Sequence, residues 1–183
     1  MVEVRRIRPD EGPALRAVRI AALTDTPSAF GANLAETLAL PDAAWATRAH
    51  RSAAGDEIAT FFAVDDPGDP VPVGVVAGLR DSPADPVVEL VSMWTAPSAR
   101  AQGVARRLVA ELLAWARSTP ATTVRLWVTD GNAPAARLYA ALGFQPTGER
   151  QPLPSDPALT ESRMELHLVS WEERRCPTPP ARP

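Results

Sequence analysis

Seven stretches of the chain carry the alternating or continuous apolar pattern that is typical of β-strands. They are rich in β-branched and aromatic residues and short enough to be strands of one sheet. The predicted strands are 2–7, 58–64, 71–80, 87–95, 123–128, 144–150 and 162–168. Turn-forming residues separate the second and third strands, so we expect these two to form a hairpin. A Pro-rich stretch over 151–160 predicts a loop between the last two strands.

Between these strands, apolar residues recur every three or four positions, which predicts amphipathic helices. The clearest case is 103–118, where Val104, Leu108, Leu112 and Trp115 form one apolar face. The other predicted helices are 11–23, 133–142, and one or two short helices within 34–53.

The resulting order is β-α-α-β-β-β-α-β-α-β-β, which indicates a mixed fold of the α/β or α+β class. A length of 183 residues fits a single domain, which we expect over 1–170. The remaining segment, 171–183, is rich in proline, and we expect this tail to be disordered.

The composition is typical of a globular protein, with 45% hydrophobic and 22% charged residues. A formal net charge of −3 gives no electrostatic reason to expect a nucleic-acid partner. No apolar run approaches the roughly 18 residues that a membrane-spanning helix needs, and the N-terminus lacks the apolar core of a signal peptide. We therefore expect no membrane association and a cytoplasmic location.

The reactive residue types are few. There is one cysteine, Cys176, and there are two histidines, His50 and His167, and no lysine. A Cys-rich zinc site, an internal disulfide, a Schiff-base lysine and a P-loop lysine are therefore excluded. The two histidines are far apart and lack metal-ligand spacing, so we expect no metal ion and disfavour a histidine-centred triad.

Between the strand 87–95 and the helix 103–118 lies the run Arg100-Ala101-Gln102-Gly103-Val104-Ala105. A strand followed by a small-residue turn and a helix can cradle phosphate, because the free N–H groups and the positive dipole end of the helix point at the anion. Such turns also occur for close packing alone, so a second signal is needed to decide between the two interpretations.

The second signal begins 29 residues after Gly103. The two blocks together resemble the GNAT superfamily of acetyl-CoA-dependent N-acetyltransferases. The cofactor pattern of that family, Arg/Gln-x-x-Gly-x-Gly/Ala, is filled by Arg100, Gly103 and Ala105. The pattern Asn-x-x-Ala-x-x-Leu-Tyr-x-x-x-Gly-Phe is filled by Asn132, Ala135, Leu138, Tyr139, Gly143 and Phe144.

The resemblance implies the GNAT-type acyl-CoA N-acyltransferase fold, with a mixed central sheet of six to seven strands flanked by about four helices. It also implies acetyl-CoA as cosubstrate and an amine as acceptor. A dinucleotide-dependent oxidoreductase is disfavoured, because the turn lacks Gly-x-Gly-x-x-Gly and follows several strands.

The resemblance further implies which residues bind acetyl-CoA. They are Met93, Trp94, Thr95, Arg100, Ala101, Gln102, Gly103, Val104, Ala105, Arg106 and Asn132. The backbone from Gln102 to Arg106 is expected on the pyrophosphate, and the backbone of Met93 and Thr95 on the pantetheine arm and the acetyl oxygen. The alternatives are a core role for the side chains of Met93 and Trp94, a solvated helix face for Arg106, and a helix N-cap for Asn132.

Two residues are candidates for the chemistry. By resemblance, Tyr139 is the general acid that protonates the departing thiolate; the alternative is a buried aromatic with a satisfied hydroxyl. Glu89 is the candidate general base, acting on the amine through water, and it shares a face with Val91 and Met93 if the strand alternates without a break. The alternative for Glu89 is a surface carboxylate at the edge of the strand.

The acceptor is the least specified part. Asp25, Phe30, Glu36, Asp42 and Trp45 could form an apolar, acidic pocket for a cation, or could serve only packing and solvation. The leading hypothesis is an N-acetyltransferase that transfers the acetyl group directly, in a ternary complex, to the primary amine of a small molecule. The alternatives are a protein N-terminus or peptide amine as acceptor, and a non-catalytic acyl-CoA-binding module. Family members are often dimers, so a homodimer is also a hypothesis.

Overall fold

The structure is a computed structural model that describes residues 2–65 and 71–168. Its strands are β1 (Glu3–Arg6), β2 (Ile58–Val64), β3 (Gly74–Leu79), β4 (Val87–Thr95), β5 (Thr123–Thr129), β6 (Gln145–Leu153) and β7 (Asp156–His167). Its α-helices are α1 (Gly12–Asp25), α2 (Leu34–Ala39), α3 (Asp42–Ala53), α4 (Val104–Ser118) and α5 (Ala133–Ala141). The predicted order of elements is confirmed, and the segment 34–53 contains two helices. The predicted tail 171–183 lies outside the described residues.

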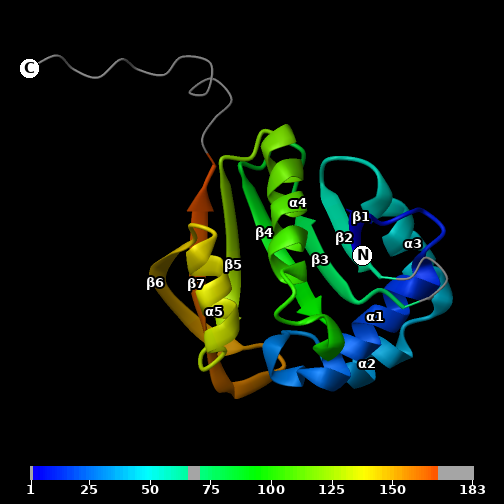
Figure 1. Cartoon of the computed structure of the whole chain (residues 1–183), viewed down its shortest axis with the longest axis horizontal. Coiled ribbons are helices and arrows are strands. Elements are labelled where there is room, and N and C mark those ends of the chain that lie inside the picture. Colours follow the sequence, from blue (N-terminus) through cyan, green and yellow to red (C-terminus); the bar gives the residue numbers. More distant parts are fainter. Residues whose placement is uncertain (1, 66–70, 169–183) are drawn as a thin grey trace, which may run out of the picture.

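The strands form one seven-stranded sheet in the order β1-β2-β3-β4-β5-β7-β6. Neighbouring strands are antiparallel except β4 and β5, which are parallel and are joined by the crossover helix α4. The mixed sheet and its flanking helices confirm the predicted fold class (Figure 1).

The prediction of a loop over 151–160 is wrong. The last two strands extend into that segment, and Gln151 pairs with Glu161 and Pro152 with Thr160. β6 is an edge strand, and an edge tolerates proline because one side of the strand has no neighbour that requires an N–H donor. Proline content alone therefore did not indicate a loop.

Helices cover the two faces of the sheet unequally. α4 lies across β3 and β4 (Figure 1) and buries Leu108 and Leu112 against one face. The approach is close: a Cβ on Gly78 of β3 would lie 2.5 Å from Cζ3 of Trp115. α1 and α3 cover the other face over β2, β3 and the end of β4, with Trp45 in that second core.

The strand β4 contains a bulge at its centre. Against β3, Trp94 pairs with Val75 and Val91 with Ala77, so one residue of β3 lies opposite two of β4. Ser92 in the bulge has a φ of 58°. An extra residue reverses the alternation of side chains beyond it. Val88 and Leu90 therefore pack on the α4 side, whereas Trp94 packs on the α1 and α3 side.

The bulge corrects one expectation about the candidate base. Met93 packs against the core on the α4 side, together with Leu90. Glu89 precedes the bulge and points to the opposite face, where it meets Arg125 of β5. Glu89 and Met93 therefore do not share a face, because the strand does not alternate without a break.

Within the described ranges, no helix is both long and apolar enough to span a membrane.

Candidate active site

A cavity of about 600 Å³ lies where β4 and β5 separate. The two strands pair only from Val87 to Glu89 of β4, against residues Thr123 to Arg125 of β5. β4 continues to Thr95 and β5 to Thr129 without pairing with each other. The cavity occupies this opening between the strands and reaches the start of α4 and one face of α5.

Nearly all predicted cofactor residues line this cavity. Those that do are Met93, Trp94, Thr95, Arg100, Ala101, Gly103, Val104, Ala105, Arg106 and Asn132, together with Tyr139. Gln102 does not line it, because its side-chain amide donates to the carbonyl oxygen of Ser98 at 2.7 Å. The fold thus brings together residues that lie up to 46 positions apart in the sequence, from Met93 to Tyr139.

The turn before α4 has the conformation of an anion cradle. Ala101 and Gly103 both have a positive φ, 59° and 77°. The first helical hydrogen bond runs from the N–H of Arg107 to the oxygen of Gly103, at 3.1 Å. The N–H groups of residues 104–106 therefore have no acceptor within the helix and, with the positive end of its dipole, can bind an anion.

Asp25, at the end of α1, links this helix to β4 and to the turn before α4. Its Oδ2 accepts a hydrogen bond from Nε1 of Trp94 at 2.9 Å and forms an ion pair with Nη2 of Arg100. The Nε of Arg100 also donates to the oxygen of Thr95 at 3.2 Å. Partial burial disfavours the charge on Asp25, but the hydrogen bonds from Trp94 and Arg100 outweigh it and lower the pKa of this carboxyl.

Tyr139 is buried, with 5% of its surface exposed, and its ring meets Phe144 edge-on at 5.6 Å between centroids. Within the described part of the chain, its hydroxyl has no hydrogen-bond partner, although the residue lines the cavity. Burial raises the pKa of Tyr139 well above that of a free phenol. The hydroxyl therefore remains protonated and can donate to a group that enters the cavity.

Asn132 lies at the start of α5 and caps that helix. Its side-chain oxygen accepts from the N–H of Ala135 at 3.3 Å. The N-cap role expected as an alternative is therefore present, and the residue also lines the cavity. The amide nitrogen can still donate, because capping uses the oxygen alone.

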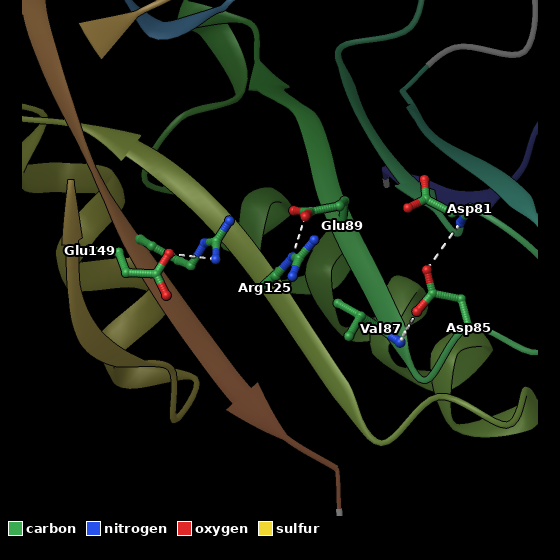
Figure 2. Close-up of polar contacts among 7 residues, drawn as sticks. Asp81, Asp85, Val87, Glu89, Arg125 and Glu149 are labelled. Atoms are coloured by element: carbon green, nitrogen blue, oxygen red, sulfur yellow. Dashed lines mark hydrogen bonds and ion pairs between the residues drawn. The ribbon is translucent and has the colours of Figure 1, made fainter. Parts of the chain in front are cut away.

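Glu89 lies beside the cavity and not in its wall. Its half-buried carboxylate forms an ion pair with Nε of Arg125 (Figure 2). On the same open face of the sheet, Arg163 pairs with Glu149 at 2.6 Å and stacks on the ring of Trp127 at 4.5 Å. The role of Glu89 as general base remains a prediction.

Of the two alternatives for Asp25, Phe30, Glu36, Asp42 and Trp45, the structure favours packing and solvation over an acidic acceptor pocket. Asp25 is paired with Arg100, the side chain of Asp42 is 98% exposed, and Glu36 lies exposed in the first turn of α2. Phe30 lines the large cavity, whereas Trp45 lines a second one that contains arginines and no carboxylate. A count of acidic residues in this segment did not indicate which of them would be neutralised by neighbours.

Several lining residues were not predicted from the sequence: Thr26, Ala29, Leu90, Val91, Ser92, Trp127, Val128, Thr129, Pro134, Ala135 and Leu138. Ala135 and Leu138 could have been found, because they share a helical face with Tyr139. Thr129 and the 3-10 turn Pro27–Ala29 meet only through the fold, where the hydroxyl of Thr129 donates to the oxygen of Ser28 at 2.8 Å.

Among the described residues, no three His, Cys, Asp or Glu side chains are grouped so that they could hold a metal ion.

Comparison with known proteins agrees with this geometry. Residues 25–144 match the model of the acetyltransferase (GNAT) family. An aminoglycoside N(6')-acetyltransferase type 1 from Serratia marcescens is 38% identical over 64 residues, which are 35% of this chain and 44% of that protein. The matching segment thus spans less than half of that relative.

Solved structures share the fold over almost the whole chain. An acetyltransferase of the GNAT family from Streptococcus pneumoniae superposes with a TM-score of 0.73 at 16% identity, over 92% of this chain and 100% of that one. The protein yncA from Salmonella typhimurium, solved with its cofactor acetyl-CoA, gives 0.70 at 18% identity, over 93% and 95%. The family match covers well over half of the sequence, and the opened sheet and the helix cradle agree with it. The chain therefore belongs to the GNAT family of acetyltransferases.

Proposed function

We propose that this chain transfers the acetyl group of acetyl-CoA directly to the primary amine of a small molecule. The observation that carries the proposal is one continuous cavity, lined both by the residues at the start of α4, whose N–H groups are free, and by Tyr139. A donor cradle at one end and a proton donor at the other are what acyl transfer from a phosphate-bearing thioester needs.

The residues present fit acetyl-CoA. The start of α4 offers unpaired N–H groups to a pyrophosphate, and the side chain of Arg106 is exposed at the rim. Beyond Glu89, the backbone groups of β4 that point toward β5 have no strand partner. Buried backbone groups need partners, and the pantetheine amides and the acetyl oxygen would supply them here. When bound, acetyl-CoA supplies an activated acetyl group.

Tyr139 acts as the general acid in this proposal. The amine nitrogen forms a bond to the acetyl carbon, the carbon–sulfur bond breaks, and the Tyr139 hydroxyl gives its proton to the sulfur. Burial raises the pKa of the phenol, and the same loss of solvent disfavours a free thiolate in the cavity, which therefore accepts the proton. The amine loses its proton to water, and Glu89 contributes only through that water, because it does not line the cavity.

The test is the release of free thiol from acetyl-CoA in the presence of a panel of amines, with wild type and Tyr139→Phe compared. The panel contains amino acids, polyamines, arylamines, short peptides and aminoglycosides, the last because one relative carries that activity in its name. We expect turnover with one small-molecule class, and about 100-fold lower kcat in the variant. The variant keeps the ring against Phe144 and loses no hydrogen bond within the described residues, so its thermal stability should be unchanged.

Each other outcome has a definite meaning. Full activity in Tyr139→Phe means that another group protonates the sulfur. Turnover that depends on residues beyond the amine of a peptide means a peptide acceptor. Protection from thermal unfolding by acetyl-CoA without turnover on any amine means a binding module instead of an enzyme.

A further inference from the structure

A second cavity, of about 330 Å³, lies between α1, α3 and the sheet. Its walls are largely apolar and include Leu15, Trp45, Val75 and Ala77. It shares two lining residues, Val91 and Ser92, with the large cavity, so the two cavities adjoin at the bulge of β4. A molecule in the second cavity can therefore reach the place where β4 opens away from β5.

The charged side chains around this second cavity are all arginines. Arg19 comes from α1, and Arg48 and Arg51 come from α3. Arg51 lies 4.0 Å from Glu57, at the limit of an ion pair. Of the described residues, none forms a hydrogen bond or an ion pair with the guanidinium groups of Arg19 and Arg48. Each guanidinium instead lies over an aromatic face: that of Arg19 is 5.2 Å from the centroid of Phe30, and that of Arg48 is 5.0 Å from the centroid of Trp45.

Two buried donors in this region have no acceptor among the described residues. Nη1 of Arg19 and the indole nitrogen of Trp45 are both buried without a hydrogen bond, and Trp45 is only 2% exposed. Burial, and then the nearby charge of Arg48, lower the pKa of Arg19, but a guanidinium remains charged at neutral pH. Buried donors and neighbouring like charges call for a compensating acceptor, which water or an anionic ligand in the cavity can supply.

We propose that the acceptor amine carries a carboxylate, which Arg19 and Arg48 bind in the second cavity while the amine reaches the bulge at Ser92. The inference rests on the proposed acetyltransferase function and specifies its substrate class as amino acids. The fork of a guanidinium matches a carboxylate in shape as well as charge, so two arginines suit this anion. The apolar walls hold the rest of a small amino acid.

The same charges disfavour other acceptors. Polyamines and aminoglycosides carry several positive charges, which Arg19 and Arg48 repel. The proposal thus predicts a specificity opposite to that expected from the aminoglycoside acetyltransferase relative.

The test compares each common amino acid that has a primary α-amine with its carboxamide as acceptor. The amine of the amide is less basic and so more often unprotonated, which by itself favours the amide. We expect at least a tenfold preference for the acid in kcat/KM. Arg19→Gln and Arg48→Gln should each abolish most of that preference by raising KM for the acid. Arg117→Gln, an exposed arginine at the end of α4, should keep it. Equal rates with acids and amides, or a preference unchanged in both variants, would overturn the proposal.

A binding measurement separates this inference from the proposed function. The ligands are N-acetyl-leucine, N-acetyl-methionine and N-acetyl-phenylalanine and their amides, titrated calorimetrically into the CoA-loaded protein. Binding of an acid but not its amide, lost in Arg19→Gln, supports the carboxylate site even if no amine is acetylated. Acetylation of other amines without any binding of these acids overturns the carboxylate site and leaves the proposed function intact. Protection by acetyl-CoA against thermal unfolding verifies that each variant is folded.

Discussion

At the scale of single residues, the carboxylate of Asp25 makes contacts that hold several parts of the candidate site in place. It joins the end of α1 to Trp94 of β4 and to Arg100 in the turn before α4. The resemblance implies that Arg100 binds acetyl-CoA, but its charge is partly neutralised by the ion pair with Asp25. Asp25 positions the turn that precedes the anion cradle and does not itself contact the acetyl group in our proposal.

Replacing Asp25 with Asn should lower stability at neutral pH by about 1 kcal/mol, because the amide keeps one acceptor for Trp94 but loses the ion pair with Arg100. The pKa of Asp25 is lower in the folded than in the unfolded chain. Its stabilising contribution is therefore complete above the unfolded pKa of about 4 and is lost as pH falls through the lower folded pKa. Urea unfolding at several pH values should show the variant and wild type converging below about pH 4.

The matched control is Asp42→Asn, which removes a carboxylate whose side chain is 98% exposed. It should leave the free energy of unfolding and its pH dependence within about 0.5 kcal/mol of wild type. A difference between Asp25→Asn and wild type that stays constant down to pH 2 would show that the ion pair contributes nothing.

At the scale of elements, the turn and first residues of α4 decide whether an anion can bind. Gly103 has a φ of 77°, and a Cβ added to it would meet nothing within 4 Å. The glycine is therefore required for its backbone conformation and for the open space in front of the helix, not for packing. No described protein atom occupies this space, so it is open to a ligand.

Gly103→Ala should cost about 1 kcal/mol of stability through backbone strain. It should also raise KM for acetyl-CoA about tenfold, because the new methyl group occupies the approach to the cradle. Gly55→Ala is the matched control, since Gly55 has a φ of 97° and equally open surroundings away from the cavity. It should lose similar stability in thermal unfolding but keep the KM of wild type. Equal effects of the two variants on KM would contradict the cradle.

Much of this element order follows from the sequence, because the strands and α4 carry regular apolar periods. Two features of the fold could not be predicted from the sequence. The bulge at Ser92 depends on how β4 pairs with β3, and no local pattern encodes the partner of a strand. The strands over 151–160 form at a sheet edge, where Pro152 is tolerated because of its place in the topology.

Some residues of the candidate site could also be predicted from the sequence, and others could not. Gly103, Asn132 and Tyr139 belong to two local motifs, and the fold brings them to one cavity. The arginines of the second cavity belong to no motif: Arg19 and Arg48 lie on different helices and meet only when α1 packs on α3. The family pattern therefore predicts the side that we propose for the cosubstrate, whereas the side that we propose for the acceptor depends on tertiary packing.

At the scale of the whole molecule, the strand pairing between the two halves of the described sheet is a single short ladder. β4 and β5 share pairs from Val87 to Glu89, and beyond these the cavity separates them. Where β4 and β5 separate, a hydrogen bond from Thr129, at the end of β5, to Ser28, in the turn after α1, also links the two halves of the sheet. A cosubstrate that binds β4, the start of α4 and Asn132 at once adds contacts across this opening, and its effect should be concentrated there.

Saturating acetyl-CoA should therefore slow hydrogen exchange in particular segments and not uniformly. We expect the greatest protection at residues 90–95 and 103–106, whose backbone groups have no partner across the cavity or within the helix. β1 and β2, on the far side of the sheet, should change little beyond the general stabilisation that any ligand of the folded state produces. Exchange followed by mass spectrometry with and without acetyl-CoA measures this. Protection of equal size in β2 and β4 would mean that the cosubstrate does not bind across the opening, since a ligand held there must order the strands that it joins first.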